Sequence, residues 1–553
     1  MIKTFDILSE NIEKHKHEDL ISYILRLREI KDVDKFTKPS KFDLEPFESM
    51  VNIISASAIV TQGIMQNKRF CVYYDVDCDG ICSGTIMYKY LQRMNANVIY
   101  DINQGKYHGL SRKSKLSKYK EKCDILIIVD SLDLDYTIYD ELQSYGIDIV
   151  ILDHHQFEEY PKSALLVSSA KYYKNPALSG SGVTWKFCAY LDHLTNNNYS
   201  DDLVDLCACG ILADVCDVSE NSPENRYLCD LGLSNLQNTG MKAIIADYKF
   251  NSNSVLWSIA PLINATQRMN KNHLALDLFL CDNLKEAKAI VKLLKDVKSS
   301  QDIAVAKEYE KAISHIEKSK FQFTTFVYTF INVPELTGLI ATKLCDEYQK
   351  PALVFVDSTS YIETIIYGSG RSLSGINLKD IIEKINLANV AGHGLAFGIN
   401  VRKDDFIQFV KALNNELSQN VFTHNVKVDC MVTILDVNNY LIEHIERINH
   451  ISGSGFKPLT FVMEEIFVHN LVLIQNKHTK FECDDIEFIC WKDTKLYTVL
   501  RCSDKCERYV SVVGNFQLNN FAGKTKKQFI ISHYYDIGEV DKDIKGDDFY
   551  FYE

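Results

Sequence analysis

The sequence predicts an α/β protein centred on a mostly parallel β-sheet with helices on both faces. Three apolar segments suited to buried strands lie at residues 68–74, 124–129 and 147–152, and a shorter strand is predicted at 97–102. Segments with helical periodicity follow or separate them, at residues 81–94, 111–122 and 136–145. Gly146 is suited to end the last of these helices. Alternation of strands and helices is typical of parallel sheets.

Acidic side chains follow each of the three long apolar segments. In open parallel sheets, ligands bind at the carboxyl ends of the strands. We therefore expect the side chains at these ends to converge along one edge. They are Asp75, Asp77, Asp79, Asp130, Asp153 and His154.

A divalent metal site is the simplest explanation for such a cluster, because carboxylates close together repel one another unless cations compensate them. Mostly oxygen ligands with one imidazole suit Mn²⁺ or Mg²⁺ better than Zn²⁺. Taken alone, the triplet at residues 153–155 is better explained by one buried, hydrogen-bonded histidine beside an exposed histidine than by a metal site. The spacing of residues 75–80 superficially permits a calcium loop, but residues 81–85 lack the glutamate that such a loop requires.

Length and composition narrow the class of protein. The 553 residues allow roughly three or four domains. A net charge of −13 argues against a protein that coats duplex DNA non-specifically, but not against a nuclease with local basic groups. We predict no membrane span and no signal peptide. The 16 cysteines lack the spacing of zinc ligands, so reduced thiols and a cytoplasmic location are expected.

Several segments flanking the predicted sheet have distinctive patterns. A short helical lead-in is expected before residue 45, and an apolar-faced helix at 47–66. The basic segment 106–122 is equally compatible with a solvated helix face and with phosphate contacts. A glycine-rich turn at 178–185 opens a helix, where backbone N–H groups can hold phosphate, although tight packing explains it as well. Residues 260–269 are expected to form a loop.

The second half of the chain predicts further units. Residues 283–320 have the pattern of one long connecting helix between lobes. Strand and helix patterns resume at 321–400, with glycine-bearing sites at 368–372 and 391–398. Residues 426–553 alternate aromatic and β-branched side chains with polar ones, as in a small β-barrel.

With these motifs in view, the chain resembles the DHH phosphoesterase superfamily and, within it, the RecJ-type single-strand-specific 5′ exonucleases. Any one motif is weak evidence, but their order and spacing together are specific. The matching elements are Asp75 to Gly80, Asp130, Asp153-His154-His155, Gly210 to Asp214, Asn264 to Arg268, Gly368 to Ser372, Ala391-Gly392-His393, Gly453 to Pro458, and Asn519 to Gly523 with Gln528.

The sequence departs from the family pattern in three places. An arginine usually found near Asn103 and Gln104, which helps to hold the 5′ phosphate, is missing, although Lys106 is close. The first glycine of the Gly-Gly-His element is Ala391. The histidine usually found before the helix at Leu336 is absent.

The resemblance implies a five-part organisation. Its parts are an N-terminal lead-in (1–45), a DHH catalytic domain (46–282), a connecting helix (283–320), an α/β DHH-associated domain (321–420) and a C-terminal OB-fold-like barrel (421–553).

The resemblance also implies a role for each site residue. Two divalent ions, Mn²⁺ or Mg²⁺, are expected, with Asp75 assisting or orienting, Asp130 as the bridge, and His155 and His393 contacting the phosphoryl oxygens. The expected metal ligands are Asp77, Asp79, Asp130, His154 and Asp214. The expected substrate-binding residues are Arg268, Ser369, Arg371, Gly392 and Lys106.

The function implied is metal-dependent 5′→3′ degradation of single-stranded DNA to 5′-mononucleotides in DNA repair, recombination or replication. The barrel would hold downstream nucleotides by stacking, with Trp491 as one candidate. A single-strand-binding protein or a helicase is a conceivable partner. One alternative is a DHH phosphodiesterase for short oligonucleotides or cyclic dinucleotides, although such substrates need no barrel. The other is a catalytically dead single-strand-binding or scaffold protein, although the ligand positions are intact.

Overall fold

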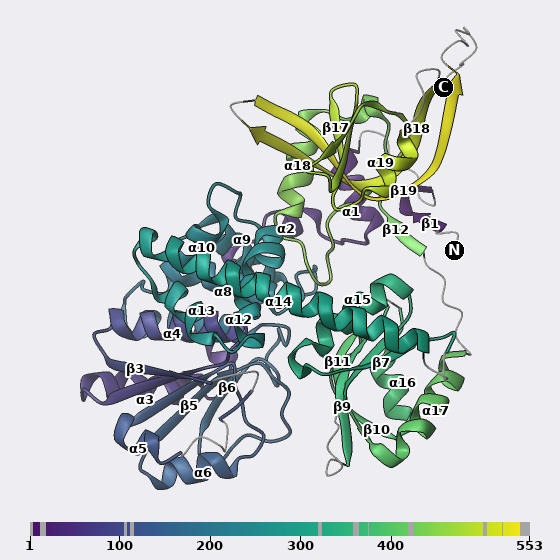
Figure 1. Ribbon diagram of the computed structural model, residues 1–553. Coiled ribbons are helices and arrows are strands. Elements are labelled where there is room, and N and C mark those ends of the chain that lie inside the picture. The colour runs from purple at the N-terminus through teal and green to yellow at the C-terminus, as the bar shows by residue number, and fades with distance from the viewer. Residues whose placement is uncertain are drawn as a thin grey trace.

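The chain folds into three sheet-containing units, and one long helix joins the first unit to the second (Figure 1). The structure is a computed structural model, and it describes residues 4–10, 18–103, 108–110, 116–318, 323–357, 364–373, 375–418, 425–501, 506–521 and 524–541. Among the described helices, none is both long and apolar enough to cross a membrane.

The first unit is built on the predicted parallel sheet. Its order is β3-β2-β4-β5-β6, and every neighbouring pair is parallel. Apolar cores cover both faces, because successive side chains of the largely buried strands β2, β4 and β5 point to opposite sides, whereas edge strand β3 is half-buried to exposed. The strands are β2 (Arg69–Tyr74), β3 (Asn97–Ile102), β4 (Ile125–Val129), β5 (Asp148–Asp153) and β6 (Leu165–Ser168).

The helices of this unit largely follow the predicted periodicity. The predicted segment 136–145 contains α6, and the predicted segment 81–94 overlaps α4, which begins three residues earlier, at Cys78. Gly146 has the positive φ of +79° expected after a helix. The helices are α3 (Ile53–Met65), α4 (Cys78–Arg93), α5 (Lys118–Lys122), α6 (Thr137–Ser144), α7 (Gly180–Thr195), α8 (Val204–Ala213), α9 (Pro223–Ser234), α10 (Thr239–Ile245), α12 (Ala260–Arg268) and α13 (Asn272–Leu280).

Two expectations for this unit need correction. Residues 260–268 form helix α12 instead of a loop, and this helix continues a helical run that begins at Ser252. A π-helical stretch, Val255–Ile259, directly precedes α12, whose second residue, Pro261, has no N–H for the usual hydrogen bond to the preceding turn. In the basic segment, only residues 118–122 of the described part are helical. There Lys118 and Lys122 lie 2.7 and 3.8 Å from the same carboxylate oxygen of Asp101, so these two cations share one ion-pair partner within the protein.

Helix α14 (Leu284–Lys318) confirms the long connection, with 35 residues. It leads to a mixed sheet of order β10-β11-β9-β8-β7, in which only β7 and β8 pair in parallel. The elements are β7 (Val327–Ile331), α15 (Thr337–Tyr348), β8 (Ala352–Val356), β9 (Ile365–Arg371), α16 (Leu378–Ile385), β10 (Ala388–His393), β11 (Ala396–Arg402) and α17 (Phe406–Ser418).

The third unit is the strand-rich C-terminal part, with sheet order β13-β14-β18-β19-β17-β16-β15. Two long strands dominate it. The elements are β13 (Cys430–Met431), α18 (Asn439–Asn449), β14 (Phe461–Phe467), β15 (His469–Ile474), β16 (His478–Cys483), β17 (Ile486–Cys490), α19 (Lys495–Leu500), β18 (Cys506–Phe521) and β19 (Lys524–Asp541).

The N-terminal segment belongs structurally to this third unit. Strand β1 (Thr4–Ile7) pairs in parallel with β12 (Asn425–Val428). Helices α1 (Leu20–Leu27) and α2 (Val33–Thr37) contribute buried side chains to the apolar core of the C-terminal sheet. The segment expected to be a lead-in therefore completes the core of a unit that lies at the other end of the sequence.

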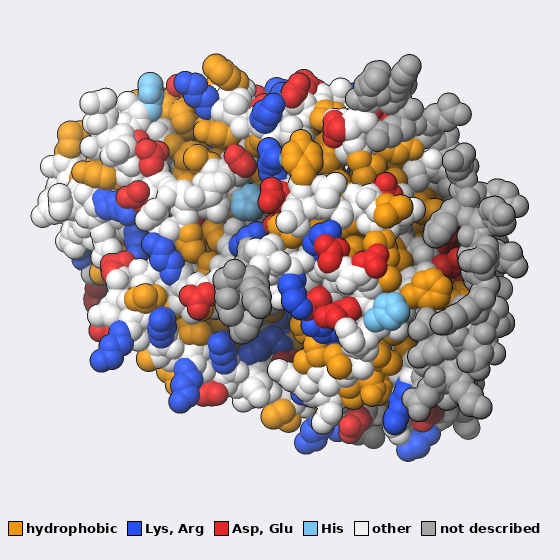
Figure 2. All heavy atoms as spheres, turned by 90° about the horizontal axis from the view of Figure 1, so that it is seen from above, with side chains coloured by type: hydrophobic (Ala, Val, Ile, Leu, Met, Phe, Trp, Pro, Cys, Tyr) orange, Lys and Arg blue, Asp and Glu red, His pale blue; other side chains and the backbone are white. Residues whose placement is uncertain are grey.

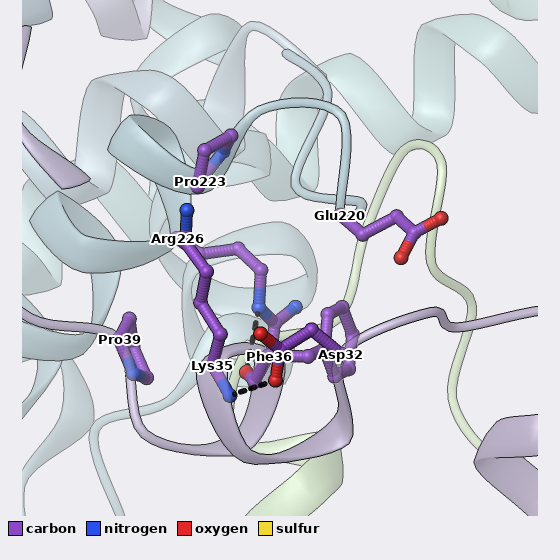
Figure 3. A pocket seen from close by; sticks show the side chains of 7 residues that line it. All are labelled: Asp32, Lys35, Phe36, Pro39, Glu220, Pro223 and Arg226. Atoms are coloured by element: carbon purple, nitrogen blue, oxygen red, sulfur yellow. Dashed lines mark hydrogen bonds between the residues drawn. The ribbon is translucent and has the colours of Figure 1, made fainter.

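Arg226 of α9 joins the first and third units. Its guanidinium lies 3.6 Å from the centre of the Phe36 ring and 5.5 Å from that of Phe456. It donates hydrogen bonds to the carbonyls of Phe36, Val218 and Ile451, at 3.2, 2.8 and 3.4 Å. Figure 3 shows Arg226 and Phe36 together in a pocket that Lys35, Glu220 and Pro223 also line.

Charged side chains are mixed on the face seen from above. Figure 2 shows lysine and arginine interspersed with aspartate and glutamate there, without an extended surface of one sign among the described residues.

Replacing Arg226 by alanine should lower the free energy of unfolding by roughly 2–4 kcal/mol, because a buried cation–π contact and charged hydrogen bonds are lost. Denaturant unfolding measures this. The matched control is Arg402→Ala, since the Arg402 side chain is 77% exposed and pairs with the nearby Asp405. Equal midpoints for the two variants would contradict the role given to Arg226.

Candidate metal centre

The acids after β2 lie at the start of helix α4. Asp75 is buried, and Asp77 is the N-cap of the helix, with its carboxylate accepting a hydrogen bond from the Gly80 N–H at 3.0 Å. The Cys78 N–H donates to Asn264 Oδ1 at 2.9 Å, so helix α12 fixes this turn from the other side. Burial raises the pKa of Asp75 to about 6, although His108 opposes the rise.

Asp79 is held by the N-terminus of helix α7. Its two carboxylate oxygens accept hydrogen bonds from the N–H groups of Gly180 and Ser181 at 2.8 and 3.1 Å, and from Ser179 Oγ at 3.1 Å. The glycine-rich turn considered above as a phosphate site thus holds a carboxylate of the protein itself. The positive end of the helix dipole favours this negative charge.

Asp130 directly follows β4, in a conformation that is unusual for a residue with a side chain. Its φ is +54°, and its buried Oδ1 has no hydrogen-bond partner among the described residues. Burial, together with the charges of Asp79 and Asp77, raises its pKa well above the ordinary value. A strained, buried and unsatisfied carboxylate is typical of a functional site.

Asp153 orients His155 and is not an open acid of the cluster. It is fully buried, and it accepts hydrogen bonds from the Leu132 N–H at 2.8 Å and the His155 N–H at 2.6 Å. His155 Nδ1 lies 2.9 Å from Asp153 Oδ1. Although burial alone would lower the pKa of His155, the charge and hydrogen bond of Asp153 raise it to about 9.

His154 lies at the centre of the remaining acids. Its Nε2 is 3.2 Å from Asp130 Oδ1, 3.6 Å from Asp214 Oδ2 and 4.0 Å from Asp79 Oδ2. Burial lowers its pKa, which favours the neutral imidazole that ligates metals. Asp214 follows helix α8 directly, and burial together with Asp79 and Asp77 raises its pKa to about 8.

The sequence analysis missed His108. Its Nδ1 lies 3.6 Å from Asp75 Oδ1, and its ring centre lies 4.3 Å from that of His155. Although burial alone would lower the pKa of His108, the hydrogen bond and charge of Asp75 raise it. The available signal was its place in the loop after the 97–102 strand, at the same sheet edge as the acids.

Two arginines from different units lie near this cluster. Arg268 ends α12 and Arg371 ends β9, and each donates a hydrogen bond to a backbone carbonyl of its own segment. Burial, followed by the charge of Arg371, lowers the pKa of Arg268. Ser369 Oγ lies 2.9 Å from Thr337 Oγ1 at the start of α15. Two neighbouring cations that form no ion pair with a carboxylate of the described residues indicate an anion site.

Of the three remaining predicted site residues, two lie among the described residues and one does not. Gly392 lies on β10 with φ +126°, and a Cβ there would come within 2.9 Å of the Phe397 backbone, so a glycine is required. His393 follows it in the strand and pairs with Ala396. Lys106 lies outside the described residues.

The donor set fits two divalent cations. Two groups of metal-binding side chains share Asp130, namely Asp75-Asp77-Asp130 and Asp130-His154-His155. A further group contains His154 and Asp214. Mostly oxygen donors and one neutral imidazole suit Mn²⁺ or Mg²⁺. The orphaned Oδ1 of Asp130 and the raised pKa values of the neighbouring acids are relieved by positive charge.

The fold and this cluster define a class of protein, and comparisons with known proteins agree with it. The model of the DHH family, N-terminal domain, matches residues 69–211, and that of the RecJ OB domain matches residues 428–533. This domain combination confirms the resemblance to the RecJ-type members of the DHH superfamily.

Individual relatives span most of the chain. A putative SPbeta prophage-derived single-strand DNA-specific exonuclease, YorK of Bacillus subtilis (strain 168), is 24% identical over 93% of this chain and 95% of its own length. The single-stranded-DNA-specific exonuclease RecJ of the same organism is 26% identical, over 90% of this chain and 64% of its own length. The crystal structure of RecJ from Thermus thermophilus with Mn²⁺ has a TM-score of 0.74 at 19% identity, covering 93% of this chain and 75% of that one.

The raised pKa of Asp214 predicts a pH-dependent stability in metal-free protein. The folded protein holds this proton up to about pH 8, whereas the unfolded chain releases it near pH 4. The stability contributed by this protonation is therefore present below about pH 4 and lost as the pH rises through 8. In chelator, Asp214→Asn should unfold at a higher temperature than the original protein at pH 8, and at a similar temperature at about pH 4.5.

Thermal unfolding at both pH values measures this effect. Asp202→Asn is the control, because that carboxylate is 64% exposed. With Mn²⁺ at pH 8, the original protein should unfold at a higher temperature than Asp214→Asn, since only the original protein retains the carboxylate ligand at residue 214. The same pH dependence in Asp214→Asn and the original protein would contradict the assignment.

Proposed function

We propose that the chain is a metal-dependent 5′→3′ exonuclease that degrades single-stranded DNA to 5′-mononucleotides, in DNA repair, recombination or replication. The observation that carries the proposal is the juxtaposition of buried acids around His154 with two arginines that form no ion pair with a carboxylate of the described residues. The acids suit a cation pair, and the arginines suit a phosphate beside it. The relatives named as single-strand DNA-specific exonucleases support the same assignment.

Five residues are proposed as ligands of two divalent ions, Mn²⁺ or Mg²⁺. Asp130 is the proposed bridge, because it belongs to two of the overlapping groups of donors. When bound, such a pair lowers the pKa of a coordinated water and stabilises the attacking and leaving oxygens of an in-line displacement. Asp75 assists from its buried position beside Asp77. The ligands are Asp77, Asp79, Asp130, His154 and Asp214.

His155 is proposed to contact the phosphoryl oxygens. Asp153 binds its Nδ1, so Nε2 is the nitrogen left to donate to a phosphoryl oxygen. A pKa of about 9 keeps the imidazole charged at neutral pH, which strengthens a hydrogen bond to an anion. His108, with its ring centre 4.3 Å away, holds the ring from another side. His393 is proposed for a similar contact from the second lobe.

The two arginines and Ser369 are proposed to bind the terminal 5′ phosphate. Arginine suits this role, because its planar fork binds two phosphate oxygens together. Gly392 permits a close backbone approach, and Lys106 is proposed as a further phosphate contact. Because this anion site would bind the terminal 5′ phosphate between the lobes, it would position the end of the DNA strand next to the metal ions, so that cleavage starts from that end.

The C-terminal unit is proposed to hold the strand downstream of the cut. Trp491 is 51% exposed and lies edge-on to His478 at 4.9 Å, which leaves its ring available for a base. Because the substrate is single-stranded, a helicase or a single-strand-binding protein is a proposed partner. This unit also favours a polymer over the alternative substrates, short oligonucleotides or cyclic dinucleotides.

Digestion of single-stranded DNA labelled at either end, with Mn²⁺, Mg²⁺ or chelator, tests the proposal. We expect mononucleotides from the 5′ end, no cleavage of a circular strand, and no activity in chelator. Asp130→Ala should reduce cleavage to the chelator level while the protein stays folded. Asp202→Ala, at an exposed acid, should retain activity. Release from the 3′ end would overturn the polarity, and activity of Asp130→Ala would overturn the metal assignment.

Arg371→Ala tests the phosphate site separately. Losing a charge-assisted contact costs roughly 1.5–3 kcal/mol, so a preference for 5′-phosphorylated over 5′-hydroxyl strands of about tenfold should disappear. Arg402→Ala, at an exposed arginine of neighbouring strand β11, should keep the preference. Initial rates on the two substrates provide the measurement. A preference that survives in Arg371→Ala would place the 5′ phosphate elsewhere.

A further inference from the structure

A cysteine lies beside the proposed metal ligands. Cys216 Sγ donates to Asp214 Oδ2 at 3.5 Å, and Asp214 Oδ2 is 3.6 Å from His154 Nε2. Donor atoms of His154, Asp214 and Cys216 all lie within 4.8 Å of one another. All three residues are partly exposed, so ions reach them from solvent. Neither the proposed cleavage nor the fold accounts for a thiol at this point.

The turn after α8 directs the carboxylate and the thiol to the same place. The N–H groups of Val215 and Cys216 return to the carbonyls of Leu212 and Ile211, at 3.1 Å each, and so close the helix end. Val215 between them has φ +58° although its side chain is β-branched, a conformation usually left to glycine. The turn therefore places the side chains of residues 214 and 216 on one side, next to His154.

We propose that His154, Asp214 and Cys216 form a binding site for a soft or borderline divalent cation such as Zn²⁺ or Cd²⁺. The inference rests on the proposed function for the role of His154 and Asp214 as ligands, and adds the thiol as a third. One nitrogen, one oxygen and one sulfur donor with an open fourth position match a tetrahedral zinc site. Cys216 binds as a thiolate, and its proton passes to solvent.

The distances fit this coordination. Bonds of about 2.0–2.3 Å in a tetrahedral site place neighbouring ligand atoms roughly 3.3–3.8 Å apart. The Sγ–Oδ2 and Oδ2–Nε2 pairs, at 3.5 and 3.6 Å, already lie in that range. A small approach of Sγ to His154 completes the site.

The consequence is competition between metals in the proposed catalytic centre. Zinc binds nitrogen, oxygen and sulfur donors more tightly than manganese does, and a thiolate widens the difference. Zinc held by Cys216 would occupy two ligands that the proposed cleavage needs for manganese or magnesium. Low zinc concentrations should therefore inhibit manganese-supported cleavage. The zinc concentration needed for half-inhibition should depend on Cys216.

Titration of the full-length protein with Cd²⁺ tests the site directly, because cadmium–thiolate bonds absorb in the ultraviolet. We expect a saturable band in the original protein that is weaker by one thiolate in Cys216→Ser, any remainder coming from the buried group Cys78, Cys82 and Cys209. Cys281→Ser is the matched control, since Cys281 is also partly exposed and its thiol donates to the Asn283 carbonyl, away from the acids. Zinc affinity, measured by competition with a chromophoric chelator, should fall roughly tenfold or more in Cys216→Ser alone.

The result that overturns the inference is a cadmium band and a zinc affinity that are the same in Cys216→Ser and the original protein. Loss of the band in Cys281→Ser would overturn it as well. Neither readout requires DNA cleavage. A Cys216-dependent band in a protein without nuclease activity would refute the proposed function and retain the cation site, whereas a nuclease without that band would do the reverse. Circular dichroism verifies that each variant is folded.

Discussion

Mutual repulsion among buried carboxylates at one sheet edge is the constraint on which the rest of the structure depends. A buried acid elsewhere in the same unit, Glu224, is neutralised by the buried Lys186 at 2.5 Å. Among the described residues, the ion pairs of Asp79, Asp130 and Asp214 involve only histidine. No lysine or arginine of the described residues balances these acids, and in metal-free protein burial and mutual repulsion raise the pKa values of Asp130 and Asp214 instead. Bound cations would relieve both effects, and this is the condition for binding them.

Close backbone packing makes this concentration of charge possible. A Cβ on Gly180 would come within 2.5 Å of Asp130 Oδ1, and one on Gly210 within 2.1 Å of Asp79 Oδ1. Bare Cα atoms of helices α7 and α8 thus lie directly against the carboxylates. This close packing also lets N–H groups at the N-terminus of α7 bind the Asp79 carboxylate. They offset its negative charge without filling the site, as a lysine side chain would. Glycine at these two positions therefore allows the helix backbones to pack directly against the carboxylates.

The sequence predicted the features that depend on local pattern. Strands β2, β4 and β5 were evident as apolar segments ending in acids, and parallel topology then placed the acids along one edge. Other features depend on tertiary contacts that no local pattern encodes. Helix α12 was taken for a loop, because one arginine there is set among small and apolar residues, whereas the segment continues a helical run from Ser252. His108 joins the site only because the chain after β3 folds back toward Asp75, whereas the local turn after α8 places Cys216 beside Asp214.

Arg268 and Arg371 place positive charge beside the acidic cluster, so the site contains two neighbouring regions of opposite charge. The acids need added positive charge, whereas Arg268 and Arg371 need added negative charge, and the two groups lie near enough for Asp77 to affect the pKa of Arg268. A metal-bound phosphodiester satisfies both needs at once, and neither ion alone does so. Since Arg371 comes from the unit beyond helix α14, the site is complete only when the two lobes are held together. In the proposed function, the long helix and the packing of both lobes against it therefore contribute to substrate binding.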